Sequence, residues 1–368
     1  MGAIPLKRRT TLPTDAVTPR FQRSARGWPS VRDPDVAELS RSDVPSPPGR
    51  LCELVRVGSE TLAISRLTIW GHTMTDWAAV TRARIDLVAG ERESESFDAW
   101  FATVPDRVER CQARWGLVLG RAYVGGAAGY VVQATTQYGL EVVLKLAYPH
   151  RESEGEASAL VEWDGDGAIR LLDSDGELSA LLLERCEPGT PLSEEPAEVA
   201  LEVIAGLLPR LWVEPQQPFR CLSDEAQWWI DDLKTHTDDY RRHDAGSLVD
   251  VAIDALQSLA PIQGTQVLVH QDLHGENILA ARREPWLVID PKPLLGEREF
   301  ALAPVIRAFE FEHTRRAVMY RRDFLCDALG VDRSRATGWA MAQTVAWALD
   351  SDYTAQHLDT AGWLADAW

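Results

Sequence analysis

Three polar residues that follow two short apolar segments have the types and the spacing needed for phosphoryl transfer. Asp272 and Asn277 come after the run VLV at 267–269, and Asp290 comes after the run WLVI at 286–289. Apolar runs of this length between polar turns are typical of buried strands. Phosphoryl transfer requires a positioned acceptor hydroxyl and cations on the phosphate oxygens. The spacing predicts that Asp272 accepts the hydroxyl proton or orients the hydroxyl, and that Asn277 and Asp290 hold Mg²⁺ through oxygen atoms.

The same stretch permits a metallohydrolase interpretation, because His270, Asp272 and His274 alternate along the chain and carry metal-ligand atoms. A zinc site needs further ligands, and no second cluster of histidines or cysteines follows in the sequence. A buried polar loop without any chemistry would not explain two carboxylates after two strands. We therefore favour phosphoryl transfer, and we expect His270 to support the loop and His274 to line the site.

The segments HQDLHGENIL at 270–279 and REPWLVIDPKP at 283–293 resemble the aminoglycoside phosphotransferase superfamily, and within it the streptomycin 6-kinase and hydroxyurea phosphotransferase branch. The IDPKP motif is the more specific part, because many kinase-like folds share the spacing between Asp272 and Asn277. The resemblance runs from about residue 97 to about residue 349. It implies a two-lobe α+β fold of the protein-kinase type, with a small antiparallel-sheet N-lobe and a mainly helical C-lobe.

The resemblance implies an ATP- and Mg²⁺-dependent transfer of phosphate to a hydroxyl of an aminoglycoside such as streptomycin, which would confer antibiotic resistance by inactivation. Hydroxyurea and an endogenous metabolite are alternative acceptors. A nucleotide-binding pseudoenzyme also stays open, because Gln271 and Ala301 stand where relatives usually carry Gly and Asp. Such an Asp braces the catalytic loop in kinase-like folds. The retained Lys145, Asp272, Asn277 and Asp290 argue against a loss of catalysis, because a non-catalytic relative has no need to keep all four.

A hairpin with a glycine-rich turn precedes a strand that carries one lysine within an apolar run. We expect strands at 117–122, 130–134 and 141–147, with Gly125, Gly126 and Gly129 in or next to the first turn. The N–H groups of such a turn can approach phosphate oxygens, although a plain hairpin uses the same residues. The resemblance implies that Lys145 binds the nucleotide phosphates and that Glu156 holds Lys145. It also implies that a linker containing Glu184 and Cys186 meets the adenine through main-chain groups.

Apolar residues at helical spacing predict most of the remaining elements. One helix is expected over 97–115 and another over 151–163, followed by a hairpin over 167–185. The C-terminal half is expected to be helical over 195–262 in three segments, from 300, over 314–329 and 333–350, and near the end. Trp228, Trp229 and Leu233 recur at helical spacing, which favours a core position for all three over a substrate platform.

The N-terminal part differs in composition from the rest of the chain. Residues 1–50 hold eight of the 21 prolines. We expect residues 1–73 to be a disordered extension, residues 74–187 to form the nucleotide-binding N-lobe with its preceding helices, and residues 188–368 to form the catalytic and substrate-binding C-lobe. One hypothesis is that the native protein begins at Met74, so that deletion of the extension leaves folding and activity intact.

Composition and charge limit the possible partners. The net charge is −18, and because residues 1–73 carry 11 basic and 7 acidic residues, the remainder carries −22. Such a field repels nucleic acid and attracts cationic small molecules, but on charge alone solubility is the preferred explanation of the acidity. No apolar run reaches the roughly 18 residues that a membrane helix requires. Five widely spaced cysteines and a poor secretory signal favour a cytoplasmic location with reduced thiols.

Overall fold

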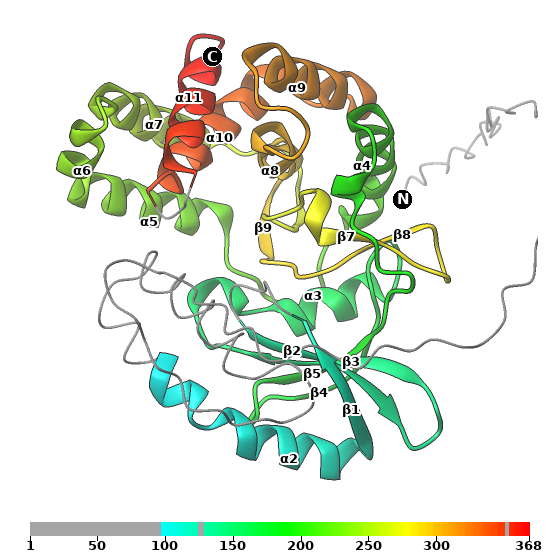
Figure 1. Cartoon of the computed structure of the whole chain (residues 1–368). Helices are drawn as coiled ribbons and strands as arrows, with labels where there is room; N and C mark the ends of the chain where they lie inside the picture. Colours follow the sequence, from blue (N-terminus) through cyan, green and yellow to red (C-terminus); the bar gives the residue numbers. More distant parts are fainter. Residues whose placement is uncertain (1–96, 124–128, 350–352) are drawn as a thin grey trace, which may run out of the picture. The chain divides into compact units, whose positions relative to one another are not determined.

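A computed structural model describes residues 97–123, 129–349 and 353–368 of the chain (Figure 1). These residues form a five-stranded antiparallel sheet with flanking helices, followed by a mainly helical lobe. The two-lobe α+β fold expected from the sequence is confirmed. Outside the described residues lie the expected extension over 1–73, the hypothetical start at Met74, and two of the predicted turn glycines, Gly125 and Gly126.

The sheet of the N-lobe has the strand order β1-β2-β3-β5-β4. Its strands are β1 (Leu117–Ala122), β2 (Gly129–Thr136), β3 (Glu141–Ala147), β4 (Leu171–Asp175) and β5 (Ala180–Glu184). β3 lies between β2 and β5, and Lys145 on β3 stands opposite Val131 and Leu181. The lysine predicted to bind phosphate therefore sits on an inner strand, where its backbone is hydrogen-bonded on both sides.

The two faces of this sheet are covered by different helices. On one face, Val142 and Leu144 of β3 belong to the same buried cluster as residues of α2 (Val104–Trp115). On the other face, Leu181 of β5 packs in a second cluster that includes α3 (Glu156–Trp163) and the C-lobe core. Successive side chains of a strand point to opposite faces, so Lys145 faces α3 while its neighbours face α2.

Two helices predicted from periodicity are interrupted in the structure. The predicted helix over 97–115 is interrupted, because residues 97–101 are helical but α2 begins only at Val104, next to Pro105. Proline lacks the N–H that would continue the preceding helix. The predicted helix over 151–163 likewise divides into a 3₁₀ turn, η1 (Arg151–Ser153), and α3. Gly155 separates them with φ of +86°, which a helix cannot contain.

The C-lobe is built mainly from seven helices of the described residues (Figure 1). They are α4 (Ala197–Leu211), α5 (Leu222–Thr235), α6 (Thr237–Arg242), α7 (Gly246–Leu259), α9 (Arg315–Leu329), α10 (Arg333–Ala346) and α11 (Thr354–Ala365). The predicted span of α9 is confirmed: Thr314 caps its start, and Gly330 ends it in the left-handed region. α10 is shorter than predicted and buried throughout 336–346. None of the described helices is both long and apolar enough to span a bilayer.

The core prediction for α5 was correct for two of three residues. Trp229 and Leu233 are fully buried, whereas Trp228 is 48% exposed and stacks on the guanidinium of Arg151 at 4.6 Å. Adjacent residues of a helix point about 100° apart, so Trp228 and Trp229 cannot share one apolar face.

Short strands of the C-lobe position the polar loops. β6 (Gln266–Val269) pairs with β9 (Leu294–Glu297), and β7 (Ile278–Ala280) pairs with β8 (Trp286–Val288). Between and after them come η2 (Leu192–Glu194), η3 (Gly275–Asn277), η4 (Arg298–Leu302) and α8 (Ala303–Arg307). The strands β6 and β8 correspond to the predicted apolar runs, while β7 and β9 were not predicted.

Candidate active site

The β7–β8 hairpin brings Asn277 and Asp290 to the same end of one element. Asn277 directly precedes β7, and its carbonyl accepts from the N–H of Ile289 at 2.9 Å. Asp290 is the next residue, with φ of +54° in the left-handed region. The Nδ2 of Asn277 donates to the carbonyl oxygen of Asp272 at 2.8 Å, which leaves Oδ1 as the oxygen of this amide that can accept a further contact.

Asp272 is partly buried, with its side chain 14% exposed, and carries a full negative charge. Nζ of Lys292 donates to its Oδ2 at 2.8 Å, and Nη2 of Arg307 lies 3.5 Å from its Oδ1. Burial raises the pKa of Asp272, but Lys292, His274 and Arg307 outweigh it and hold that pKa well below its usual range. A carboxylate in this state is a weak base with a well-defined orientation.

His270 is a buried, neutral support of the loop. Its Nε2 lies 2.9 Å from the carbonyl oxygen of Ile289, and its Nδ1 accepts from the N–H of Asp272 at 3.3 Å. Burial lowers the pKa of His270 to about 4. Because both ring nitrogens are occupied by main-chain groups, His270 has no atom for zinc. In the described part of the chain, no group of three or more His, Cys, Asp or Glu side chains could hold a metal ion.

Lys145 connects the N-lobe to these residues. Its Nζ lies 2.7 and 2.8 Å from the carboxylate oxygens of Glu156 on α3, so the predicted pairing is confirmed. The same Nζ lies 2.5 Å from Oδ1 of Asp290. Burial lowers the pKa of Lys145, but Asp290 and Glu156 outweigh it and the net direction is upward. Lys145 is therefore a buried ammonium between two carboxylates.

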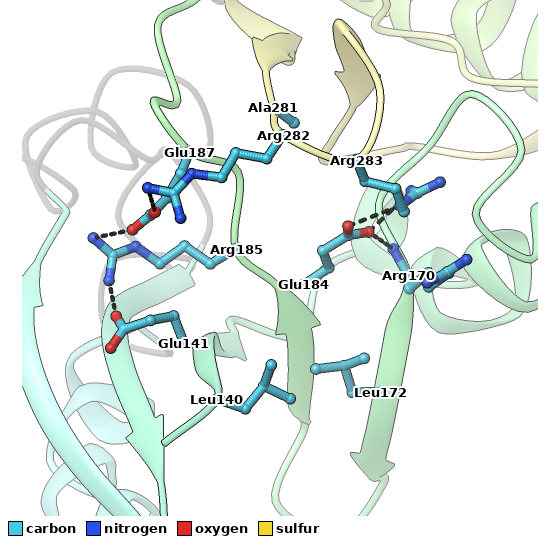
Figure 2. Close-up of a pocket in the computed structure, with 10 residues that line it drawn as sticks. All are labelled: Leu140, Glu141, Arg170, Leu172, Glu184, Arg185, Glu187, Ala281, Arg282 and Arg283. Atoms are coloured by element: carbon cyan, nitrogen blue, oxygen red, sulfur yellow. Dashed lines mark hydrogen bonds and ion pairs between the residues drawn. The ribbon is translucent and has the colours of Figure 1, made fainter. Parts of the chain in front are cut away.

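The predicted linker residues lie at the end of β5 and directly after it. The carboxylate of Glu184 points to Arg283, whose Nε and Nη2 donate to it at 2.8 and 2.9 Å (Figure 2). Arg283 also donates to the carbonyl oxygens of Gly165 and Ala168. Cys186 is buried, and its main-chain N–H and carbonyl make no main-chain hydrogen bond within the described ranges.

A pocket of about 480 Å³ lies next to this linker. Figure 2 shows the residues that line it. The charged lining residues are paired with one another, because Arg185 binds Glu141 and Glu187, and Arg282 also binds Glu187. Leu140, Leu172 and Ala281 complete the lining. The pocket does not include Asp272, Asn277 or Asp290.

Of the predicted turn glycines, only Gly129 can be placed. A Cβ atom there would lie 2.7 Å from the carbonyl oxygen of Leu146, so the close approach of β3 already excludes a side chain. Packing within the sheet explains this glycine without reference to a phosphate.

Gln271 and Ala301, which stand where relatives usually carry Gly and Asp, are both buried. Gln271 is buried with φ of +67°, a conformation that glycine adopts without strain. Ala301 is buried in η4. The carboxylate of Glu310 accepts from the N–H of Gly275 in the loop at 2.9 Å, so a carboxylate braces this loop although position 301 holds none.

Sequence reasoning did not assign Lys292 and Arg307 to the site, and it did not foresee the contact of Glu310 with the loop. Lys292 lies within the IDPKP motif, two residues after Asp290, so its position could have been recognised. Arg307 and Glu310 lie more than 30 residues from Asp272, and no local pattern predicts that they contact the catalytic loop.

Comparison with known proteins agrees with this geometry. Residues 114–352 match the model of the aminoglycoside/hydroxyurea antibiotic resistance kinase family. The chain is 38% identical to the streptomycin 6-kinase of Streptomyces griseus over 267 residues, or 70% of this chain and 87% of that protein. It is 39% identical to the hydroxyurea phosphotransferase of Kitasatospora aureofaciens over 252 residues, or 66% and 71% of the two chains. The resemblance inferred from the two motifs is confirmed.

The fold also has solved counterparts. The choline kinase LicA from Streptococcus pneumoniae superposes with a TM-score of 0.54 at 15% identity, covering 72% of this chain and 99% of that one. A structure of LicA in complex with AMP gives a TM-score of 0.51 at 14% identity, covering 71% and 98%. At these identities the likeness concerns the fold alone.

Proposed function

This chain belongs to the aminoglycoside/hydroxyurea antibiotic resistance kinase family, and we propose that it transfers the γ-phosphoryl group of ATP to a hydroxyl of a streptomycin-like aminoglycoside. Membership makes it a phosphotransferase with an alcohol group as acceptor. Phosphorylation would inactivate the antibiotic and confer resistance. The observation that carries the proposal is the convergence of Asp272, Asn277 and Asp290 next to the buried ammonium of Lys145.

Asp272 is the proposed catalytic residue. Its low pKa means that it is ionised at neutral pH and has little tendency to remove a proton from a free hydroxyl. It can accept a hydrogen bond from the acceptor hydroxyl and take the proton once the bond to phosphorus is forming. This order suits the loose transition state of phosphoryl transfer, in which positioning contributes more than early deprotonation.

Asn277 and Asp290 are the proposed Mg²⁺ ligands. One amide oxygen and one ionised carboxylate fit this ion, because Mg²⁺ commonly uses one or two protein oxygens together with water and phosphate oxygens. The pKa of Asp290 is lowered, since Lys145 and Lys292 outweigh the effect of burial. When bound, Mg²⁺ would supply positive charge to the phosphate oxygens.

Lys145, held by Glu156, is the proposed phosphate ligand of the N-lobe. Cys186 is the proposed adenine neighbour, because its main-chain groups are not used within the described part of the protein. The complex of LicA with AMP supports nucleotide use by this fold. Gly129, Gly125 and Gly126 remain candidates for the phosphate turn.

The charge distribution favours streptomycin over hydroxyurea as the acceptor. Residues 74–368 carry a net charge of −22, which attracts a polycation but gives no advantage to a neutral molecule. The chain also spans more of the streptomycin 6-kinase of S. griseus than of the hydroxyurea enzyme. We place the reaction in the cytoplasm, where ATP is available and the four described cysteines would stay as free thiols.

The direct test is transfer of labelled phosphate from ATP·Mg²⁺ to streptomycin by the full-length protein, with hydroxyurea as a parallel acceptor. Asp272→Asn should reduce kcat by about 10²–10⁴-fold. The matched control is Asp254→Asn, the same exchange at an exposed position of α7, which should leave the rate unchanged.

Transfer to hydroxyurea alone would replace the proposed acceptor while keeping the reaction. ATP binding without transfer to either acceptor would favour an endogenous metabolite or a pseudoenzyme, and would contradict the proposal as stated.

A further inference from the structure

Two basic side chains lie on the two carboxylate oxygens of Asp272. Lys292 contacts Oδ2 and Arg307 contacts Oδ1. Lys292 follows β8, whereas Arg307 is the last residue of α8, so separate elements deliver the two cations. Both also lie over the ring of Trp347, with Nζ at 5.5 Å and the guanidinium carbon at 4.3 Å from its centroid. The arrangement holds two positive charges at the proposed acceptor position.

Arg307 is buried with part of its hydrogen-bonding capacity unused. The residue is 7% exposed, and its Nη1 has no hydrogen-bond partner in the described part of the chain. Arg321 is also buried, at 1% exposure, but donates to the carbonyl oxygens of Ile306, Phe311 and Glu312. A buried charge without full pairing is costly, so an unpaired donor of this kind calls for an explanation, and a bound ion or a catalytic role is one.

The unused donors match an anion with several oxygens. A guanidinium has five N–H donors and an ammonium three, so both cations keep donors free while they contact Asp272. Lys292 has a second carboxylate nearby, Glu152 at 3.6 Å, and still keeps one N–H. A phosphoryl group offers three oxygens with spread negative charge, which a guanidinium fork and a point charge can bind together.

We infer that Lys292 and Arg307 form an anion site that holds the phosphoryl group during its transfer; this inference rests on the proposed function. In the step, the acceptor oxygen forms a bond to the γ-phosphorus. The bond from that phosphorus to the β–γ bridging oxygen breaks, and its electron pair stays on ADP. The hydroxyl proton passes to Asp272. The two cations stabilise the phosphoryl oxygens, on which charge develops in the transition state.

The anion site also restricts how a cationic substrate can bind. Guanidinium groups of an aminoglycoside would be repelled by Lys292 and Arg307, so the hydroxyl to be phosphorylated must be presented with the charged groups directed away from Asp272.

The test compares Arg307→Ala and Arg307→Lys with the wild-type protein in the labelled-phosphate assay. Arg307→Ala should lower kcat by about 10²–10³-fold, the usual cost of one preorganised donor. Guanidinium ion at millimolar concentration should restore part of the rate, because it can occupy the space that the side chain leaves. Arg307→Lys should stay slow, because an ammonium does not reproduce the planar fork.

A second readout separates binding of the phosphoryl group from a merely structural role. ADP·Mg²⁺ with aluminium fluoride mimics the phosphoryl group in transit, and calorimetry should show it to bind the wild-type protein more tightly than ADP·Mg²⁺ alone. Arg307→Ala should lose this gain and keep its affinity for ADP·Mg²⁺. The control is Arg298→Ala, which removes a guanidinium stacked 5.5 Å from the ring of Trp212 and should keep both the gain and the rate.

The outcomes are distinct for the two proposals. A wild-type protein that phosphorylates neither streptomycin nor hydroxyurea contradicts the proposed function, whereas the calorimetric gain tests the anion site directly. The inference is overturned if a folded Arg307→Ala variant has the wild-type kcat and still binds ADP·Mg²⁺ with aluminium fluoride more tightly than ADP·Mg²⁺ alone, by the wild-type factor. If Arg307→Ala does not fold, kcat and the affinity gain from aluminium fluoride are measured on Arg307→Lys. Wild-type values of both quantities in that variant also overturn the inference.

Discussion

Lys145 and Asp290 form an ion pair between the lobes, with Nζ on β3 lying 2.5 Å from Oδ1 of the residue two positions after β8. The same Nζ lies 2.7 Å from Glu156. Because Lys145 is the proposed phosphate ligand and Asp290 a proposed Mg²⁺ ligand, this pair joins the two halves of the nucleotide site. Loss of Lys145 would leave Glu156, which is 4% exposed, without its cation.

Lys145→Met should therefore destabilise the protein as well as weaken nucleotide binding. Breaking a buried ion pair from one side costs about 3–5 kcal/mol, because an uncompensated charge stays inside. The double variant Lys145→Met with Glu156→Gln should regain most of that loss, since no unpaired charge remains at position 156. Urea unfolding at pH 7 measures the free energy of unfolding of the single and the double variant. A double variant as unstable as the single one would show that the buried carboxylate is not the cause.

Asp290→Asn and Asn277→Ala should each raise the Mg²⁺ concentration needed for half-maximal activity. Changes to groups around a metal cost about 10–100-fold in affinity, and loss of a direct ligand should cost at least the lower value. Titration of activity with Mg²⁺ at saturating ATP measures the shift. Asp254→Asn, exposed on α7, serves as the control. Unchanged Mg²⁺ dependence in both site variants would remove these residues as ligands.

Stability should fall on the acid side because His270 is buried in its neutral form. Its folded pKa of about 4 lies below the unfolded value of about 6.5, so between these values the unfolded chain binds the proton more readily. The contribution of His270 to the free energy of unfolding is complete above pH 6.5. It declines as the pH falls, by about 2 kcal/mol at pH 5. His270→Gln removes the titrating group, so its unfolding free energy should decline less between pH 7 and pH 5. Equal declines in the two proteins would refute this assignment.

Glu310 should act as a brace of the catalytic loop. Glu310→Ala removes the acceptor for the N–H of Gly275, and loss of a hydrogen bond to a charged group costs about 1.5–3 kcal/mol. We expect a lower melting temperature and a lower kcat. Glu310→Gln keeps an oxygen acceptor and should stay close to wild type in both measurements. If Gln is as damaging as Ala, the charge of Glu310 matters more than the hydrogen bond, as it would for a cationic substrate.

The sequence allowed the reactive residues to be predicted where they lie close together along the chain. Asp272, Asn277 and Asp290 fall within 19 residues. The β7–β8 hairpin brings Asn277 and Asp290 together, and Asn277 contacts Asp272 in the loop before the hairpin, so the spacing along the chain predicted most of this arrangement. Lys145 and Glu156 were assigned through the family resemblance, and their contact is present. The roles of these residues stay predictions until they are tested.

What could not be predicted depends on contacts between distant segments. Arg307 contacts Asp272 from the last residue of α8. The periodicity of the sequence does not predict such a contact between distant segments. Trp228 was misassigned because apolar character was given more weight than its angular position on α5. Pro105 indicated that the first predicted helix is interrupted. The interruption was not predicted, because the apolar spacing on the two sides of Pro105 was treated as continuous.

Arg283 fastens the turn of the β7–β8 hairpin to Glu184 of the linker, while the open end of the same hairpin carries Asn277 and Asp290. One short hydrogen-bonded hairpin therefore connects the linker, at its turn, to the two proposed Mg²⁺ ligands, at its open end. We expect a substitution of Arg283 to alter the position of these two ligands as well as the contact with Glu184.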